Sequence, residues 1–204
     1  MQKINVGVFI YDNVEVLDFA GPYEVFSVTR LLDKPDFRDP SPFDILIISD
    51  NTIPVTTMSG MKVIPDYSFE DCPDLDILVV PGGLGERTLH SNQDTLGFIS
   101  SHAGKVKTLA SVCTGAFFLA NAGLLNNKRA TTHTLSLDRL EQGFPEIDVI
   151  KDKRYVEDDN IITSAGISAG IDMSLYIVSK YFGEKVSRLT ATEMEYPYPE
   201  SDSR

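Results

Sequence analysis

The segment Leu109-Ala110-Ser111-Val112-Cys113-Thr114-Gly115-Ala116 places a cysteine between an apolar run and an alanine-rich run. The apolar residues predict a buried strand over 107–112, and the residues after the cysteine predict a helix over 114–122. In open α/β sheets, ligands bind outside the carboxyl ends of the strands. We therefore predict that Cys113 stands on a sharp strand-to-helix turn, as in the nucleophile elbow of hydrolases, with Gly115 making room for the turn.

Strand and helix patterns alternate along the rest of the chain. Further strands are predicted over 4–10, 43–49, 76–80, 147–150, 154–157 and 160–163, with a hairpin formed by 53–57 and 61–64. Further helices are predicted over 22–32, 92–103, 134–142, 168–182 and 184–194, the first beginning at Gly21-Pro22 and the helix over 168–182 ending at Gly183. This alternation predicts an α/β fold with a mostly parallel sheet and helices on both faces.

The domain organisation expected from the sequence is simple. Residues 1–195 suit a single domain, and residues 196–204 are expected to form a frayed or surface-draped C-terminal tail. The segment 33–42 is rich in proline and charge and is expected to be a loop.

Composition restricts the function classes. The 204 residues are 42% hydrophobic with a net charge of −12, which opposes binding to nucleic acid or to anionic membranes. No apolar run is long enough to span a membrane, and no signal peptide is evident. The two cysteines, Cys72 and Cys113, form no CxxC motif. We expect a cytoplasmic protein that acts on a small molecule, with both cysteines as free thiols.

The functional interpretation of Cys113 competes with a structural one, since free cysteines are often buried packing residues. The position at a strand end favours function, and the N-terminus of the predicted helix is expected to stabilise the thiolate, which is the nucleophilic form. Cys72 lies in a loop among acidic residues that disfavour its thiolate, so we interpret it as structural or incidental.

Other candidate site residues follow predicted strands. Asp18 could exchange a proton with a substrate or could act as a helix cap. The backbone N–H groups of Gly82 and Gly83 could donate to a ligand or form a plain turn. His133 could be a base, a donor or a structural histidine. Thr114 could bind substrate or cap its helix.

The sequence contains no HExxH motif, no cluster of Cys and His ligands and no GxGxxG after the first strand. We therefore expect neither a metal nor a dinucleotide cofactor.

Taken together, five segments resemble the DJ-1/PfpI superfamily, also called the ThiJ/PfpI or class-I glutamine-amidotransferase-like group. They are Leu17-Asp18-Phe19-Ala20-Gly21-Pro22-Tyr23-Glu24-Val25-Phe26, Val80-Pro81-Gly82-Gly83, Ser111-Val112-Cys113-Thr114-Gly115-Ala116, Ala122-Gly123-Leu124-Leu125 and Ala130-Thr131-Thr132-His133. The resemblance covers about residues 3–190. It implies a flavodoxin-like sandwich, a nucleophile elbow and a homodimer.

Within that superfamily the chain is most similar to isonitrile hydratases and to the sensor domains of AraC-type regulators. PfpI-type proteases carry a histidine after the cysteine, where this chain has Thr114, and DJ-1 carries a glutamate where this chain has Asp18. Asp18 with Cys113-Thr114 is the isonitrile hydratase pattern.

That resemblance implies that Cys113 attacks the terminal carbon of an isonitrile, that Asp18 supplies a proton, and that water releases an N-substituted formamide from a thioimidate. Thr114 and the backbone of Gly82-Gly83 would position the substrate or water. One alternative is a stress-response hydrolase, deglycase or redox sensor, in which the thiol is oxidised. Another is a ligand-sensing module related to AraC-type regulators, although the acidic charge and the end of the chain at Arg204 are expected to disfavour DNA binding.

Overall fold

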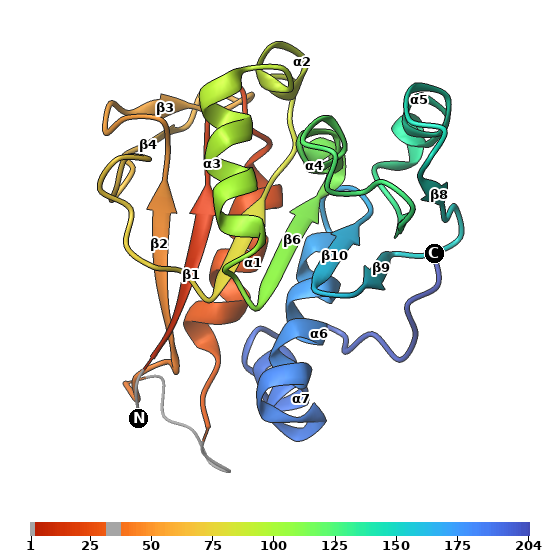
Figure 1. The fold of residues 1–204 in the computed structure, drawn as a ribbon. Helices are drawn as coiled ribbons and strands as arrows, with labels where there is room; N and C mark the ends of the chain where they lie inside the picture. Colours follow the sequence, from red (N-terminus) through yellow and green to blue (C-terminus); the bar gives the residue numbers. More distant parts are fainter. Residues whose placement is uncertain (1–2, 32–37) are drawn as a thin grey trace.

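A six-stranded sheet forms the centre of the molecule (Figure 1). The computed structural model describes residues 3–31 and 38–204. The strand order is β2-β1-β5-β6-β10-β9, and all neighbours are parallel except β9, which runs antiparallel to β10. The strands are β1 Ile4–Phe9, β2 Phe43–Ile48, β5 Ile77–Val80, β6 Thr108–Val112, β9 Tyr155–Asp158 and β10 Ile161–Ser164.

Helices cover both faces of this sheet (Figure 1). They are α1 Val16–Val28, α2 Glu86–Leu89, α3 Gln93–Ala103, α4 Ala116–Asn121, α5 Leu137–Gly143, α6 Ala169–Phe182 and α7 Glu184–Glu193. The described residues also form two 3-10 turns, η1 Cys113–Gly115 and η2 Thr134–Ser136, and two small sheets, β3 Val55–Thr56 with β4 Lys62–Val63 and β7 Arg129–Ala130 with β8 Asp148–Val149.

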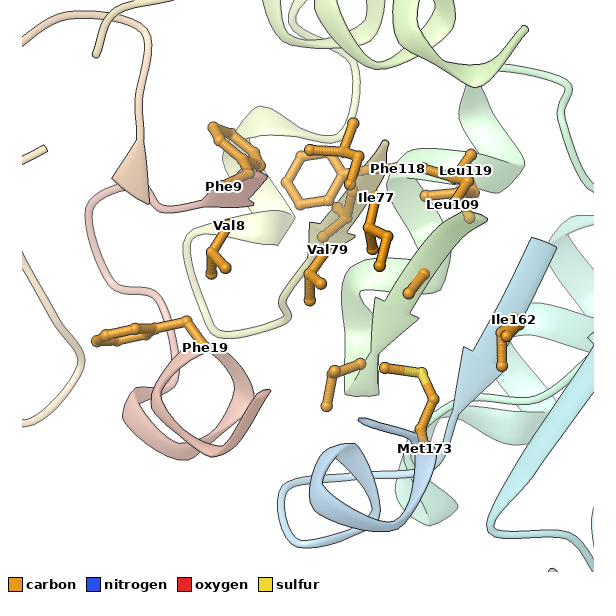
Figure 2. Packing of buried hydrophobic residues seen from close by; sticks show 14 of the residues in the cluster. Val8, Phe9, Phe19, Ile77, Val79, Leu109, Phe118, Leu119, Ile162 and Met173 are labelled. Atoms are coloured by element: carbon orange, nitrogen blue, oxygen red, sulfur yellow. The ribbon is translucent and has the colours of Figure 1, made fainter. Parts of the chain in front are cut away.

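The core lies on both sides of the sheet, so successive residues of the central strands are buried on either face. All residues of β5 and β6 are buried. Figure 2 shows Phe118 and Leu119 of α4 on one side of the strands, and Phe19 of α1 and Met173 of α6 on the other. The α/β, flavodoxin-like class predicted from the sequence is confirmed.

The start of α1 differs from the sequence-based expectation. The helix begins at Val16 and not at Gly21-Pro22, so that Pro22 lies inside it. The preference of proline for the first turn of a helix is a local one. Pro22 has no N–H to donate within α1, but burial of Phe19 and Val25 against the sheet outweighs the loss of that hydrogen bond. This earlier start brings Asp18 into the first turn of the helix.

Other boundaries agree closely with the sequence pattern. The hairpin of β3 and β4 is present, and α6 ends at Gly183, whose φ of 89° suits glycine. Of the loop expected over 33–42, residues 33–37 lie outside the described residues. No helix among the described residues is long and apolar enough to cross a membrane.

Candidate active site

Cys113 occupies a strained turn at the carboxyl end of β6. Its φ is 59°, in the left-handed region that residues other than glycine rarely adopt. Two hydrogen bonds fix this backbone: the Cys113 N–H donates to the Ala165 carbonyl at 3.1 Å, and the Cys113 carbonyl accepts from Oγ1 of Thr132 at 2.7 Å. The predicted nucleophile elbow is therefore present.

Gly115 permits this turn to lie against the neighbouring strand. A Cβ atom at this position would collide with the carbonyl oxygen of Val80, the last residue of β5. The expectation that the turn needs a residue without a Cβ is confirmed, and the reason is close packing, since Gly115 itself has ordinary helical angles.

Asp18 projects from the first turn of α1 and is fully buried. Its Oδ2 accepts a hydrogen bond from the backbone N–H of Gly82 at 3.0 Å, whereas its Oδ1 has no hydrogen-bond partner among the described residues. Burial raises the pKa of Asp18 to about 7, and hydrogen bonds from Gly82 and Cys113 oppose this rise. The side chain can therefore hold or release a proton near neutral pH.

The Cys113 side chain is 7% exposed, and its ionisation differs from the sequence-based expectation. Burial first, and the adjacent Asp18 carboxylate second, raise the pKa of the thiol well above its ordinary value. The backbone N–H groups of Thr114 and Ile167 act in the opposite direction. The prediction of a stabilised thiolate is wrong, because burial and the Asp18 carboxylate outweigh the hydrogen bonds that favour the charged sulfur.

Asp18 and Cys113 thus form a pair of buried acids in contact. Asp18 raises the pKa of the Cys113 thiol, whereas the hydrogen bond from that thiol lowers the pKa of Asp18, so above about pH 7 Asp18 is a carboxylate and Cys113 keeps its proton. A carboxylate next to a thiol is an arrangement for moving that proton while the sulfur forms a bond.

The N–H groups of Gly82 and Gly83, which follow β5, donate to side chains of the protein and not to a ligand. The N–H of Gly82 is occupied by Asp18, and the N–H of Gly83 donates to Oγ1 of Thr114 at 3.1 Å. These groups are therefore not free ligand donors, and they orient the side chains of Asp18 and Thr114. An added Cβ on Gly82 would lie 2.5 Å from the backbone N and from Oγ1 of Thr114.

A pocket of about 380 Å³ opens next to the cysteine. Cys113, Thr114, Gly83 and His133 line it, whereas Asp18 and Gly82 do not. His133 accepts a hydrogen bond at Nδ1 from the N–H of Leu135 at 3.1 Å, which turns the rest of the ring away from that backbone. The other lining residues are Glu15, Met58, Leu84, Glu86, Arg87, Leu135, Ser136 and Ile167.

Sequence reasoning missed Ile167, whose backbone hydrogen-bonds to both Cys113 and Asp18 and lowers the pKa of each. Ile167 has a φ of 56° and follows β10, so its loop meets the turn at Cys113 at the same edge of the sheet. The rule that carboxyl ends of parallel strands converge could have identified this loop. Its backbone conformation has no sequence signal, because isoleucine rarely adopts a positive φ.

Cys72 lies away from this pocket and is half-buried. Burial first, and then Asp71 and Asp74, raise the pKa of its thiol to about 11. The expected effect of the neighbouring acids is confirmed. Among the residues that the structure describes, no group of three or more His, Cys, Asp or Glu side chains could hold a metal ion.

The chain is similar to known proteins in sequence and in fold. A model of the DJ-1/PfpI family matches residues 4–180. Isonitrile hydratase of Pseudomonas putida is 38% identical over 202 residues, which are 98% of this chain and 82% of that protein. The HTH-type transcriptional regulator GbdR of Pseudomonas aeruginosa is 26% identical over 90% of this chain, which spans 48% of the regulator.

Solved structures share the fold. The crystal structure of a ThiJ/PfpI family protein from Pseudomonas syringae has a TM-score of 0.83 and 30% identity, and the match covers 99% of this chain and 79% of that one. Drosophila melanogaster DJ-1beta has a TM-score of 0.79 at 20% identity, covering 97% and 100% of the two chains, and its likeness concerns the fold alone.

Proposed function

Because the chain belongs to the DJ-1/PfpI family, we propose that it is an enzyme that hydrates isonitriles, R–N≡C, to N-substituted formamides. The observation that carries this proposal is the buried pair of Cys113 and Asp18 beside a pocket. The 38% identity to isonitrile hydratase of Pseudomonas putida supports it. Because one fold hosts many activities, the proposed reaction depends on the chemistry of Cys113 and Asp18 and not on family membership alone.

In the first half-reaction, the sulfur of Cys113 bonds to the terminal carbon of the isonitrile as the thiol proton passes to the Asp18 carboxylate. The same carbon then takes this proton from Asp18, which gives a thioimidate, S–CH=N–R. One S–H bond is broken and the N≡C triple bond becomes a double bond, as one S–C and one C–H bond are formed and nitrogen gains a lone pair. An Asp18 pKa of about 7 suits both parts of this transfer.

In the second half-reaction, water adds to the thioimidate carbon and delivers one proton to nitrogen. The S–C bond then breaks, the remaining hydroxyl proton returns through Asp18 to the sulfur, and the product is HC(=O)–NH–R. Thiol and carboxylate are both restored, so no cofactor is consumed.

The remaining residues have supporting roles in this proposal. Gly82 holds Asp18 in place, and Gly83 holds the hydroxyl of Thr114 at the pocket wall. Thr114 and His133 line the pocket, where they orient the substrate nitrogen or the attacking water.

A turnover assay tests the proposal. The purified protein is incubated with n-butyl isonitrile, and the formyl proton of the product is followed by NMR against a buffer blank. We expect turnover by wild type and by Cys72→Ala, and loss of turnover in Cys113→Ala and Asp18→Asn. Absence of formamide with wild type, or equal rates with Cys113→Ala, would reject the function.

A redox-sensing role is the main alternative from the family. Reaction with peroxide requires the thiolate, and the raised pKa of Cys113 disfavours that form. Selective oxidation of Cys113 by mild peroxide, in a protein without isonitrile turnover, would favour this alternative.

A ligand-sensing role is suggested by the match to the regulator GbdR. Binding of an isonitrile or another small molecule in the pocket without product release would favour it. The homodimer and the cytoplasmic location expected from the sequence stay predictions, and light scattering of the purified protein would test the first.

A further inference from the structure

The segment 196–204 contacts the loop that carries His133. Arg204 donates to three residues of the loop 131–134: Nη2 donates to Oγ1 of Thr131 at 2.9 Å and to the carbonyl of Thr132 at 2.8 Å, and Nη1 donates to Oγ1 of Thr134. Nε donates to the carbonyl of Lys153 at 2.9 Å. One guanidinium therefore fixes several groups of the loop 131–134 at once, which its planar fork of donors permits.

Thr132 connects this contact to the nucleophile turn. Its side chain is fully buried, and its Oγ1 donates to the Cys113 carbonyl at 2.7 Å. The same residue thus accepts from Arg204 at its carbonyl and donates to Cys113 from its hydroxyl. A shift of the Thr132 backbone would lengthen the bond that holds Cys113 at its φ of 59°.

His133 provides a second connection through the same loop. Its ring lies so close to Gly166 that a Cβ atom there would collide with it. Gly166 precedes Ile167, whose backbone hydrogen-bonds to Cys113 and Asp18. The loop 131–134 therefore supports the turn at Cys113 in two ways, through the hydroxyl of Thr132 and through the packing of His133 against Gly166.

Anchors outside the loop place Arg204 at this position. The N–H of Arg154 donates to the Asp202 carbonyl at 2.6 Å, and Nζ of Lys153 pairs with the Asp202 carboxylate at 2.7 Å. Farther along the segment, Arg188 pairs with Glu200 at 2.8 Å. The segment is thus held at several points, and Arg204 is the one whose side chain reaches the loop of the active site.

We propose that Arg204 is a positioning residue for the nucleophile: through Thr132, it holds the backbone of Cys113 in the conformation that keeps the sulfur against Asp18. The inference rests on the site of the proposed function. Its consequence is that loss of Arg204 lets the turn relax, moves the sulfur away from the carboxylate and makes the thiol easier to ionise.

The test follows alkylation of Cys113 by iodoacetamide against pH, with Cys72→Ser as the background and mass spectrometry as the readout. We expect the midpoint of the alkylation profile to fall by at least about one pH unit in Arg204→Ala, because the thiol loses its charged neighbour. Thr132→Val, which replaces the hydroxyl with a methyl group of similar size, is expected to produce a similar fall. Arg204→Lys is expected to show the same lowered midpoint as Arg204→Ala, since one ammonium group cannot replace the several N–H donors of the guanidinium group.

Arg188→Ala is the matched control, because it cuts another arginine contact of the same segment without touching the loop 131–134. Its midpoint is expected to equal that of the background protein. In the double variant of Arg204→Ala and Thr132→Val, the midpoint is expected to fall no further than in the single variant with the larger shift. Both substitutions interrupt the same connection from Arg204 through Thr132 to Cys113.

An unchanged midpoint in Arg204→Ala, or strictly additive shifts in the double variant, would overturn the inference. Circular dichroism verifies that each variant is folded, and if Arg204→Ala does not fold, Thr132→Val and Arg204→Lys decide the question by the same criterion. The readout needs no isonitrile, so a protein that shows the shift without forming formamide would contradict the proposed function and leave this inference standing.

Discussion

The backbone N–H of Gly82 donates to Oδ2 of Asp18 at 3.0 Å, and this bond joins the loop after β5 to the buried carboxyl beside the nucleophile. Asp18 comes from α1, Gly82 from the loop after β5, and Cys113 from the turn after β6. Three segments that are distant in sequence therefore meet at one edge of the sheet, as expected for carboxyl ends of parallel strands. The alignment of the carboxyl with the sulfur depends on this bond.

Replacement of Gly82 by alanine is expected to disable the site. The new Cβ would lie 2.5 Å from the backbone N of Thr114 and 3.0 Å from Oδ2 of Asp18, so the loop must move away from both. A displacement of this size at reacting groups lowers kcat/KM by about 10²-fold. The measurement is formamide formation by Gly82→Ala.

Gly97→Ala is the control for that substitution. Gly97 lies in α3, and an added Cβ would have no atom within 4 Å. We expect unchanged activity and a gain of about 0.5–1 kcal/mol in unfolding free energy, because alanine is the better helix former. Wild-type activity in Gly82→Ala would show that the contact is dispensable.

Asp18→Asn is expected to stabilise the fold in a pH-dependent way. The pKa of Asp18 is about 7 in the folded protein against an ordinary 3.8, so the folded state retains a proton that the unfolded chain loses. The contribution of Asp18 to stability therefore decreases as the pH rises from about 4 to 7, and above pH 7 it includes the cost of a buried charge. Asparagine can still accept from Gly82 and has no charge to bury.

The difference in unfolding free energy between Asp18→Asn and wild type should thus be largest at pH 8 and small at pH 4. Its upper limit is about 4 kcal/mol, from a shift of roughly three pKa units at 1.36 kcal/mol each. Urea unfolding at a series of pH values measures it. A constant difference between pH 5 and pH 8 would contradict a raised Asp18 pKa.

Activity is expected to depend on the same ionisation. The proposed first step needs Asp18 as a carboxylate and Cys113 as a thiol, the pair that holds one proton. Below pH 7, Asp18 takes up a second proton, so kcat/KM should fall toward tenfold per pH unit. Rates measured from pH 5 to 9, with a buffer blank subtracted at each pH, test this; a flat profile, or one that rises toward acid, would rule out the carboxylate as the initial proton acceptor.

Much of the fold was predictable because it rests on local patterns. The apolar run before Cys113 and the small residues after it indicated a strand and a turn, and both are present. The start of α1 was not predictable from local preference, because packing of Phe19 and Val25 overrode the signal of Gly21-Pro22.

The sequence predicted which residues lie together at the candidate site better than it predicted their pKa values. Cys113, Asp18 and Thr114 follow predicted strands and lie together, whereas the direction of the Cys113 pKa shift depends on burial and on the distance to Asp18, which no residue pattern encodes. The same holds for Gly82 and Gly83, whose N–H groups have partners within the protein. The contact of Arg204 with Thr132 joins residues 72 positions apart and had no sequence signal.

The central claim is that Cys113 forms a covalent adduct with the isonitrile during hydration, and rapid-quench mass spectrometry tests it most directly. Wild-type protein mixed with n-butyl isonitrile should gain the mass of one isonitrile, mapped to the peptide containing Cys113, and lose it at the rate of formamide release. Formamide production without any adduct on Cys113, or with the adduct on Cys72 alone, would contradict the account.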